Sequence, residues 1–330
     1  MEKVMANRTD RKRSHNEDTT HAGASPTYDC AIVGAGPAGL SAAIYMGRMR
    51  RSVVVIDSKQ GRSTWHQVNR NYLGFRDGIH ATALREIGEE QESQFGVVFH
   101  DALASTVKMK GEGEARRFTL GTTDGQVVAR SIILATGVSD KFPEFEGSEE
   151  CIGKSMFWCI ICDGYEATGK KIVVLGHGDR AATLALQLLA FTPHVTLVSW
   201  DEKLTIDGAK LDMLQEHGIA VHDSACNVYQ CSAGQLSFVQ LDDGTKLELD
   251  TLFVAQHMEP NNELAKQLNL RLDEHGFVLT DTEQVTNVEG VFAAGDLTKL
   301  NNHQVASAVH EGGMAAAAAN YYLYEEWQRE

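Results

Sequence analysis

Proline and long hydrophobic runs are scarce in this sequence. Only 5 of its 330 residues are proline, against 30 glycines, which favours many tight turns and excludes proline-rich linkers. No stretch approaches the roughly 18 consecutive apolar residues of a membrane-spanning helix, so we expect no segment to cross a bilayer. The length is sufficient for two globular domains, each with its own hydrophobic core.

Positive charge is also in short supply. Lys and Arg number 30 against 45 Asp and Glu, which gives a net charge of −15 at pH 7. Proteins bind nucleic acids through Lys and Arg beside the phosphates, and anionic membrane surfaces require the same charge. The composition therefore argues against nucleic acid or an anionic membrane as a partner.

The first 26 residues lack the apolar segment of a secretory signal. They are polar, with few large apolar side chains, so we expect 1–26 to be a disordered tail. Without a signal the expected location is the cytoplasm, where a close cysteine pair is catalytic or metal-binding rather than structural. The six cysteines, too few for a disulfide scaffold, are Cys30, Cys151, Cys159, Cys162, Cys226 and Cys231.

Residues 28–58 have the pattern of a strand, a glycine turn, a helix and a second strand. Gly34 permits the tight turn, Gly36 lets the backbone approach a pyrophosphate, and Gly39 lets helix and strand pack closely. Asp57 follows Gly36 by 21 positions, the spacing of a carboxylate that accepts a hydrogen bond from a ribose hydroxyl. This unit predicts a dinucleotide-binding site.

A similar pattern recurs over residues 171–199, where a strand leads into the turn Gly176-x-Gly178 and a second helix and strand follow. Two such units indicate two nucleotide sites, or a duplicated fold in which one site has changed its role. The expected fold class is α/β, with two Rossmann-like domains of three layers each.

Cys159 and Cys162 lie in the segment FWCIICDGYE. A Cys-x-x-Cys at the start of a helix brings the sulfurs within bonding distance and lowers the thiol pKa. Asp163 follows directly and can act as acid and base during thiolate formation. Two alternatives to a redox-active disulfide stay open from the residues alone: an inert buried pair, and a zinc site completed by Cys226 and Cys231.

Five motifs in order resemble the low-molecular-weight thioredoxin reductases over about residues 27–325. The resemblance implies FAD and, in most members, a homodimer. It implies a discontinuous FAD-binding domain over 27–141 and 255–330, with an inserted pyridine-nucleotide-binding-like domain over 142–254 that carries the cysteine pair. The motifs are the two glycine turns, Ala135-Thr136-Gly137, Cys159-x-x-Cys162-Asp163-Gly164 and Gly295-Asp296.

The resemblance also implies roles for single residues. Cys162 would be the thiol nearest the flavin, Cys159 the interchange thiol that attacks a substrate, and Asp163 the group that moves protons for the pair. Asp296 would hold the FAD ribitol, and Asn71 would lie beside the flavin. The residues expected to bind FAD are Gly34, Gly36, Gly39, Asp57, Asn71, Thr136, Gly137, Gly295, Asp296, His303 and Gln304.

The second glycine turn departs from the NADPH-dependent members of this family. Those usually carry two arginines after the next strand, which neutralise the 2′-phosphate, but here Trp200, Asp201 and Glu202 follow. Thr183 and Leu184 stand where two glutamates are usual. Because two acids repel a 2′-phosphate, we do not expect NADPH as the donor, whereas NADH stays compatible with the sequence.

Further departures lie near the expected flavin. Arg62 and Trp65 belong to a segment that replaces the usual Gly-Gly-Gln, and His303 stands where many relatives have arginine. Trp158 adds aromatic surface. Trp200 either caps the domain core or stacks on an aromatic ring. These features predict a second site, for a nucleotide or for a second FAD, at Gly176, Gly178 and Trp200.

The departures resemble the nicotinamide-independent branches of the family: gliotoxin-type dithiol oxidases, diflavin-linked disulfide oxidoreductases and ferredoxin-linked thioredoxin reductases. We therefore expect an FAD-dependent dithiol/disulfide oxidoreductase whose substrate is a thioredoxin-like protein or a small dithiol. Its electron partner stays open between ferredoxin, oxygen and another carrier. The alternatives are an NAD(P)H-dependent thioredoxin reductase and a non-enzymatic zinc-binding protein.

Overall fold

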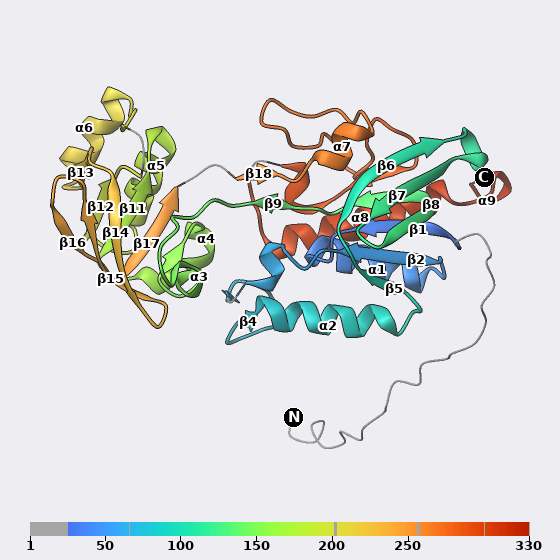
Figure 1. Ribbon diagram of the computed structural model, residues 1–330, viewed down its shortest axis with the longest axis horizontal. Helices are drawn as coiled ribbons and strands as arrows, with labels where there is room; N and C mark the ends of the chain where they lie inside the picture. Colours follow the sequence, from blue (N-terminus) through green and yellow to red (C-terminus); the bar gives the residue numbers. More distant parts are fainter. Residues whose placement is uncertain (1–25, 66, 201–202, 256–257, 300, 330) are drawn as a thin grey trace, which may run out of the picture.

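The computed structural model describes residues 26–65, 67–200, 203–255, 258–299 and 301–329. The chain forms two α/β units, each built around its own sheet with a parallel central part (Figure 1). The expected α/β class with Rossmann-like domains is confirmed. The expected disordered tail over 1–26 lies outside the described residues except for its last position, and so do Asp201 and Glu202.

The larger sheet has seven strands in the order β5-β2-β1-β8-β7-β6, with β19 beside β8. Strands β5, β2, β1, β8 and β19 are parallel to one another, whereas β6, β7 and β8 form an antiparallel meander. The bounds are β1 Thr27–Val33, β2 Val53–Asp57, β5 Val98–Asp101, β6 Ala104–Lys110, β7 Arg117–Thr122, β8 Gly125–Leu134 and β19 Val291–Ala293.

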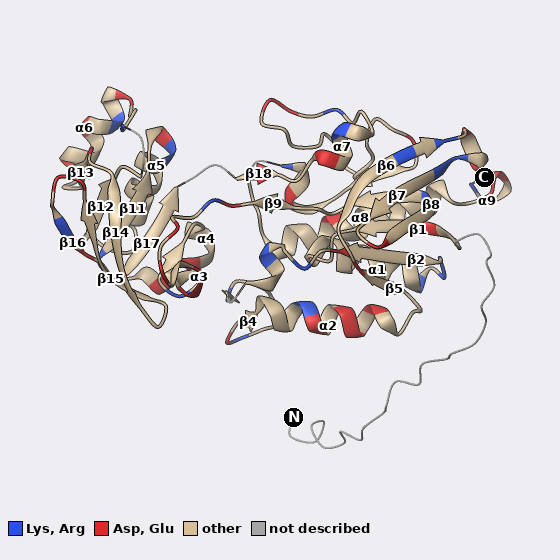
Figure 2. Cartoon of the chain, in the orientation of Figure 1, with Lys and Arg blue, Asp and Glu red and all other residues tan. Residues whose placement is uncertain are grey.

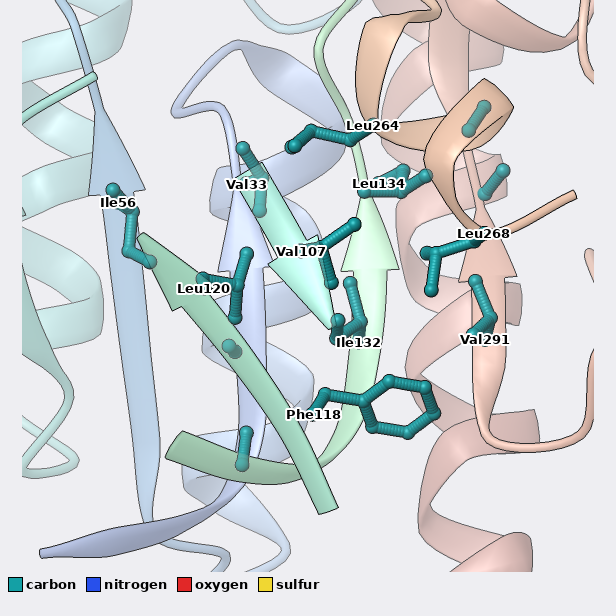
Figure 3. Close-up of a cluster of buried hydrophobic side chains, with 14 of the residues drawn as sticks. Val33, Ile56, Val107, Phe118, Leu120, Ile132, Leu134, Leu264, Leu268 and Val291 are labelled. Carbon is teal, nitrogen blue, oxygen red and sulfur yellow. The ribbon is translucent and has the colours of Figure 1, made fainter. Parts of the chain in front are cut away.

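Both faces of this sheet are buried, as expected for parallel strands. Along β1, Cys30 and Ile32 pack with the helices α1 (Pro37–Arg48) and α8 (Val305–Tyr322). The alternate residue Val33 faces a second cluster (Figure 3). This cluster contains Ile56, Val107, Phe118, Leu120, Ile132, Leu134, Val291 and, from around α7 (Glu263–Gln267), Leu264 and Leu268.

The smaller sheet has five parallel strands in the order β10-β17-β11-β12-β13. Helices α5 and α6 pack on one face, and the antiparallel sheet β14-β15-β16 covers the other. The bounds are β10 Met156–Phe157, β11 Ile172–Gly176, α5 Gly178–Leu188, β12 Val195–Val198, α6 Gly208–Glu216, β13 Ala220–His222, β14 Cys226–Ser232, β15 Gln235–Leu241, β16 Lys246–Glu248 and β17 Thr251–Ala255.

Two segments connect the sheets and run side by side, because β9 pairs with β18 in antiparallel register. This is the geometry expected of one domain inserted into another. We propose that residues 27–141 and 255–330 form the discontinuous domain and that residues 142–254 form the inserted one. The remaining elements are β3 Val68–Asn69, β4 Ile79–His80, α2 Ala81–Ser93, β9 Val138–Ser139, α3 Ser148–Cys151, α4 Ile160–Asp163, β18 Glu259–Pro260, α9 Glu326–Arg329 and the 3-10 turns Arg62–Thr64, Gly113–Ala115, Tyr165–Ala167 and Gly295–Thr298.

Helices α1 and α8 approach each other closely in the larger unit (Figure 1). A Cβ atom on Gly312 of α8 would overlap the backbone carbonyl oxygen of Ala38 in α1. Glycine at this position therefore permits the approach. None of the helices in the described part of the chain combines the length and apolar character needed to cross a membrane.

We expect Gly312→Ala to destabilise the protein by about 1–3 kcal/mol, because the new methyl group must push two backbones apart. Gly313→Ala is the matched control. Its Cβ would lie 3.3 Å from the ring of Tyr45, a side chain that is 52% exposed and free to turn away. Thermal unfolding should show a lower midpoint for the first variant and an equal or higher one for the second, whose helix propensity improves. Equal midpoints would contradict the packing argument.

Candidate functional site

A cavity of about 520 Å³ begins at the first glycine turn. Gly34 has a φ of 103°, and a Cβ on Gly39 would overlap the carbonyl oxygen of Gly34, so both positions require glycine. A Cβ on Gly36 would meet no atom within 4 Å, which leaves its backbone open to a ligand. The predicted residues that line this cavity are Gly34, Gly36, Asp57, Asn71, Thr136, Gly137, Cys162, Asp163, Gly295, Asp296, His303 and Gln304.

Asp57 lies at the end of β2, beside this turn. Its carboxylate accepts hydrogen bonds from the backbone N–H groups of Ala35 and Lys59, both at 2.9 Å. Arg85 of α2 forms an ion pair with it at 2.8 Å, and both side chains are nearly buried. The sequence did not predict the ion pair between Arg85 and Asp57. Arg85 stands four positions before Glu89, a spacing typical of an ordinary ion pair along one helix.

The cysteine pair forms a disulfide at the start of α4. Cys159 caps this helix, and its sulfur accepts a hydrogen bond from the backbone N–H of Cys162 at 3.1 Å. Gln304, the residue that caps α8, places its side-chain nitrogen 3.4 Å from the Cys162 sulfur and 3.6 Å from that of Cys159. Its amide oxygen accepts a hydrogen bond from Asn71 at 2.8 Å. The structure thus brings four predicted site residues into one hydrogen-bonded group.

Asp163 directly follows Cys162 at the end of α4 and is half-buried. Burial raises the pKa of its carboxyl group from 3.8 to about 7, and the negative charge of Glu166 adds to the rise. Arg70 acts in the opposite direction but is engaged in an ion pair with Glu166 at 3.4 Å. A carboxyl group that titrates near neutral pH can both accept and donate a proton beside a thiol.

Arg62 is enclosed by polar groups at the end of the same cavity. It binds Asp140 through two guanidinium nitrogens and Asp296 at 3.0 Å. The guanidinium nitrogen that binds Asp296 also lies 3.3 Å from His303 Nδ1, and His303 Nε2 lies 2.6 Å from the carbonyl oxygen of Lys299. This arrangement suits a neutral imidazole that accepts at Nδ1 and donates at Nε2. Two departures from the family pattern, Arg62 and His303, therefore contact each other.

Three aromatic rings pack edge to face beside Arg62. The ring centroids of Trp65, Phe142 and Trp158 lie 5.2–5.6 Å apart. Trp158 borders both the first cavity and a second one of about 380 Å³. Cys159 lines only the second cavity and Cys162 only the first, so each cavity has one cysteine of the disulfide in its wall.

The second glycine turn leads into the second cavity, because Asp179 and Arg180, which directly follow Gly178, line it. Gly176, Gly178 and Trp200 line neither of these two cavities. Trp200 packs against the hydrophobic cluster between the five-stranded sheet and β14-β15, which fits the interpretation that it caps the domain core. Thr183 and Leu184, which replace the two glutamates, line the second cavity.

The zinc alternative required four cysteines to come together. Within the residues that the structure describes, no group of three or more His, Cys, Asp or Glu side chains is placed to hold a metal ion. Cys226 is buried, and Cys231 lies beside Cys151 rather than beside the Cys159–Cys162 disulfide. The four cysteines of the zinc alternative are therefore not gathered into one site.

We expect Asp163→Asn to slow thiol–disulfide exchange at Cys159–Cys162 about 100-fold, because the variant lacks the proton acceptor. In the wild-type protein the rate should rise as the pH passes through about 7, where the carboxylate becomes deprotonated. The measurement is the rate of disulfide reduction by dithiothreitol as a function of pH, divided by the fraction of the reagent present as thiolate.

Glu166→Gln serves as the control. It removes the negative charge that raises the Asp163 pKa, so the midpoint should move to lower pH while the plateau rate is kept. An Asp163→Asn profile that matches the wild type would exclude Asp163 as the proton acceptor.

Comparisons with known proteins agree with this geometry. The family model for pyridine nucleotide-disulphide oxidoreductases matches residues 28–312. Thioredoxin reductase from Treponema pallidum (strain Nichols) is 32% identical over 304 residues, with 90% of this chain and 97% of that protein covered. The crystal structure of HlmI has a TM-score of 0.83 at 30% identity and covers 93% of this chain and 95% of its own.

The atypical thioredoxin reductase TRi from Desulfovibrio vulgaris Hildenborough is 36% identical, with a TM-score of 0.51 and coverage of 91% and 99%. FAD, which the family implies, fits the first cavity, because an open glycine turn and the carboxylate of Asp57, at the spacing of a ribose partner, lie in its wall. The chain belongs to the pyridine nucleotide-disulphide oxidoreductase family and is a thioredoxin reductase-type, flavin-linked disulfide oxidoreductase.

Proposed function

We propose that this enzyme exchanges electrons between FAD and a thiol substrate through the Cys159–Cys162 disulfide, without NADPH. The observation that carries the proposal is the position of the disulfide between two cavities, with Cys162 on the flavin side and Cys159 on the other. A substrate sulfur that enters the second cavity would reach Cys159 while Cys162 remains beside the flavin site. Cys159 would therefore react with the substrate, and Cys162 would exchange electrons with the flavin.

The protein's own groups would act on the sulfurs and their protons. Bound FAD would supply the two-electron chemistry that side chains lack. Gln304 would hold both sulfurs in place through its side-chain nitrogen, itself oriented by Asn71. Asp163 would accept the proton of the thiol that becomes the attacking thiolate and give it to the thiolate that leaves when the disulfide closes.

The proposal that NADPH is not the donor has two supports. The sequence places Asp201 and Glu202, which lie outside the described residues, where relatives have phosphate-binding arginines. Thr183 and Leu184 give the second cavity a hydroxyl and an apolar side chain in place of two carboxylates. The alternative is an NAD(P)H-dependent thioredoxin reductase, which the names of the relatives favour.

The lining of the second cavity indicates which kind of substrate could reach Cys159. Trp158, Phe142 and Ile160 supply apolar surface next to Cys159, and Arg180 and Lys210 also line the cavity. Pockets of a few hundred Å³ with apolar walls and few polar groups suit small molecules. We propose a small dithiol as the substrate, and a thioredoxin-like protein as the second candidate. As an oxidase the enzyme would pass electrons on to oxygen or another carrier, and as a reductase it would receive them from ferredoxin or NADH.

We expect anaerobic NADPH at micromolar concentration to leave the bound flavin oxidised, while dithiothreitol bleaches its absorbance within minutes. Cys162→Ser should abolish bleaching by dithiothreitol, because the sulfur on the flavin side is removed. Photoreduction of the same variant provides the control that its flavin can still accept electrons. Rapid, stoichiometric bleaching by NADPH would favour the alternative function.

The prediction of a second FAD keeps its support from the sequence departures, but Trp200 packs in the core and lines neither described cavity. We therefore expect one FAD per chain. The measurement is the FAD released by denaturation of the reconstituted protein, divided by the protein concentration from amino-acid analysis. A ratio of two would establish the second flavin.

A further inference from the structure

Two cysteines outside the flavin site lie almost within bonding distance. The sulfurs of Cys151 and Cys231 are 2.6 Å apart, although 80 positions separate them in the sequence. Carbon atoms in contact are about 3.5–4.0 Å apart and sulfur is larger, whereas a disulfide bond is about 2.05 Å long. The separation is therefore much nearer to a bond than to an ordinary contact.

The backbones on both sides of this pair are already held together. Cys151 ends α3, and Cys231 lies near the end of β14. The hydroxyl of Ser155 donates to the carbonyl oxygen of Gly234 at 2.8 Å and accepts from the backbone N–H of Leu236 at 3.1 Å. A Cβ on Gly234 would overlap the carbonyl oxygen of Glu150. Because this contact exists without a sulfur bond, closing one would require little backbone movement.

The pair is separate from the flavin chemistry. Cys151 is fully buried in the cluster between the five-stranded sheet and β14-β15, and Cys231 packs against the same cluster. Neither residue lines the two cavities that flank the Cys159–Cys162 disulfide. Its chemistry therefore does not depend on the proposed function.

We propose that Cys151 and Cys231 are a second redox-active pair, which closes into a disulfide linking α3 to β14 by exchange with a low-molecular-weight disulfide. The pair is a modification site rather than part of the catalytic centre. The reverse reaction with a small dithiol reopens it.

The partly exposed Cys231 makes the first attack. Its thiolate displaces one thiolate from the small disulfide and forms a mixed disulfide. Cys151 then attacks the Cys231 sulfur, its proton passes to the departing thiolate, and two small thiols have been released for one protein disulfide. Burial raises the pKa of Cys151 to about 12, which fits this second, internal role.

Negative charge lies near Cys151 and decides which small disulfide suits the experiment. Glu149 and Glu150 precede Cys151 on α3, where Figure 2 shows acidic residues. An anionic disulfide would be repelled at this surface. We therefore choose bis(2-hydroxyethyl) disulfide, which carries no charge.

The test uses full-length Cys159→Ser/Cys162→Ser protein, so that the only thiols are Cys30, Cys151, Cys226 and Cys231. After incubation with bis(2-hydroxyethyl) disulfide and denaturation, we expect free thiols to fall from four to two and to return to four with dithiothreitol. Peptide mass spectrometry should identify a link between residues 151 and 231. The wild-type protein, whose Cys159 and Cys162 already form a disulfide, should likewise fall from four free thiols to two when treated in parallel. This comparison shows that the result does not come from misfolding of the double variant.

Cys226→Ser in the same background is the matched control, because Cys226 lies on the same strand β14 and in the same cluster. It should leave the 151–231 link intact, whereas Cys231→Ser should abolish it. Four free thiols, a stable adduct on Cys231 alone, or a link to Cys226 would each overturn the proposal.

Discussion

The close packing of α8 against α1 is the constraint on which the site depends. Gly312 permits the approach to Ala38, and the packed helix α8 in turn holds its N-terminal end in place within the fold. Gln304, the capping residue at that position, contacts both sulfurs of the disulfide. Helix α8 also holds part of the wall of the first cavity, because Glu311 in this helix accepts a hydrogen bond from the backbone N–H of Gly295 at 2.8 Å. A helix–helix contact in the core thus positions the redox pair against the cavity for FAD.

The electrostatics of the site follow from burial. Asp163 is half-buried next to Cys162 and near Glu166, and partial burial raises the pKa of its carboxyl group to about 7. Arg62 is buried at the other end of the cavity, but two carboxylates, Asp140 and Asp296, bind it and compensate its charge. Arg62 and His303 are both departures from the family pattern, and they contact each other. A guanidinium group, that of Arg62, therefore still lies next to position 303, where many relatives carry arginine.

The two α/β units show how far a shared pattern can diverge. Both begin with a glycine turn between a strand and a helix, but only the first turn borders the 520 Å³ cavity. In the second unit, Trp200 joins the domain core. The space beside Cys159 is instead lined by residues from both units, among them Trp158, Leu184 and His303. A nucleotide-binding pattern in the sequence therefore does not establish that the site still binds a nucleotide.

The sequence alone determined the features that local backbone geometry demands. The first glycine turn, Asp57 and the Cys159–Cys162 pair lie in short motifs whose spacing already specifies how they meet, and the structure has them together. Only the tertiary structure decided which distant charges and sulfurs pair: Arg62 with Asp296, Arg85 with Asp57, and Cys151 with Cys231. These partners are brought together by the packing of separate elements. Their meeting depends on the whole core, which no short stretch of sequence records.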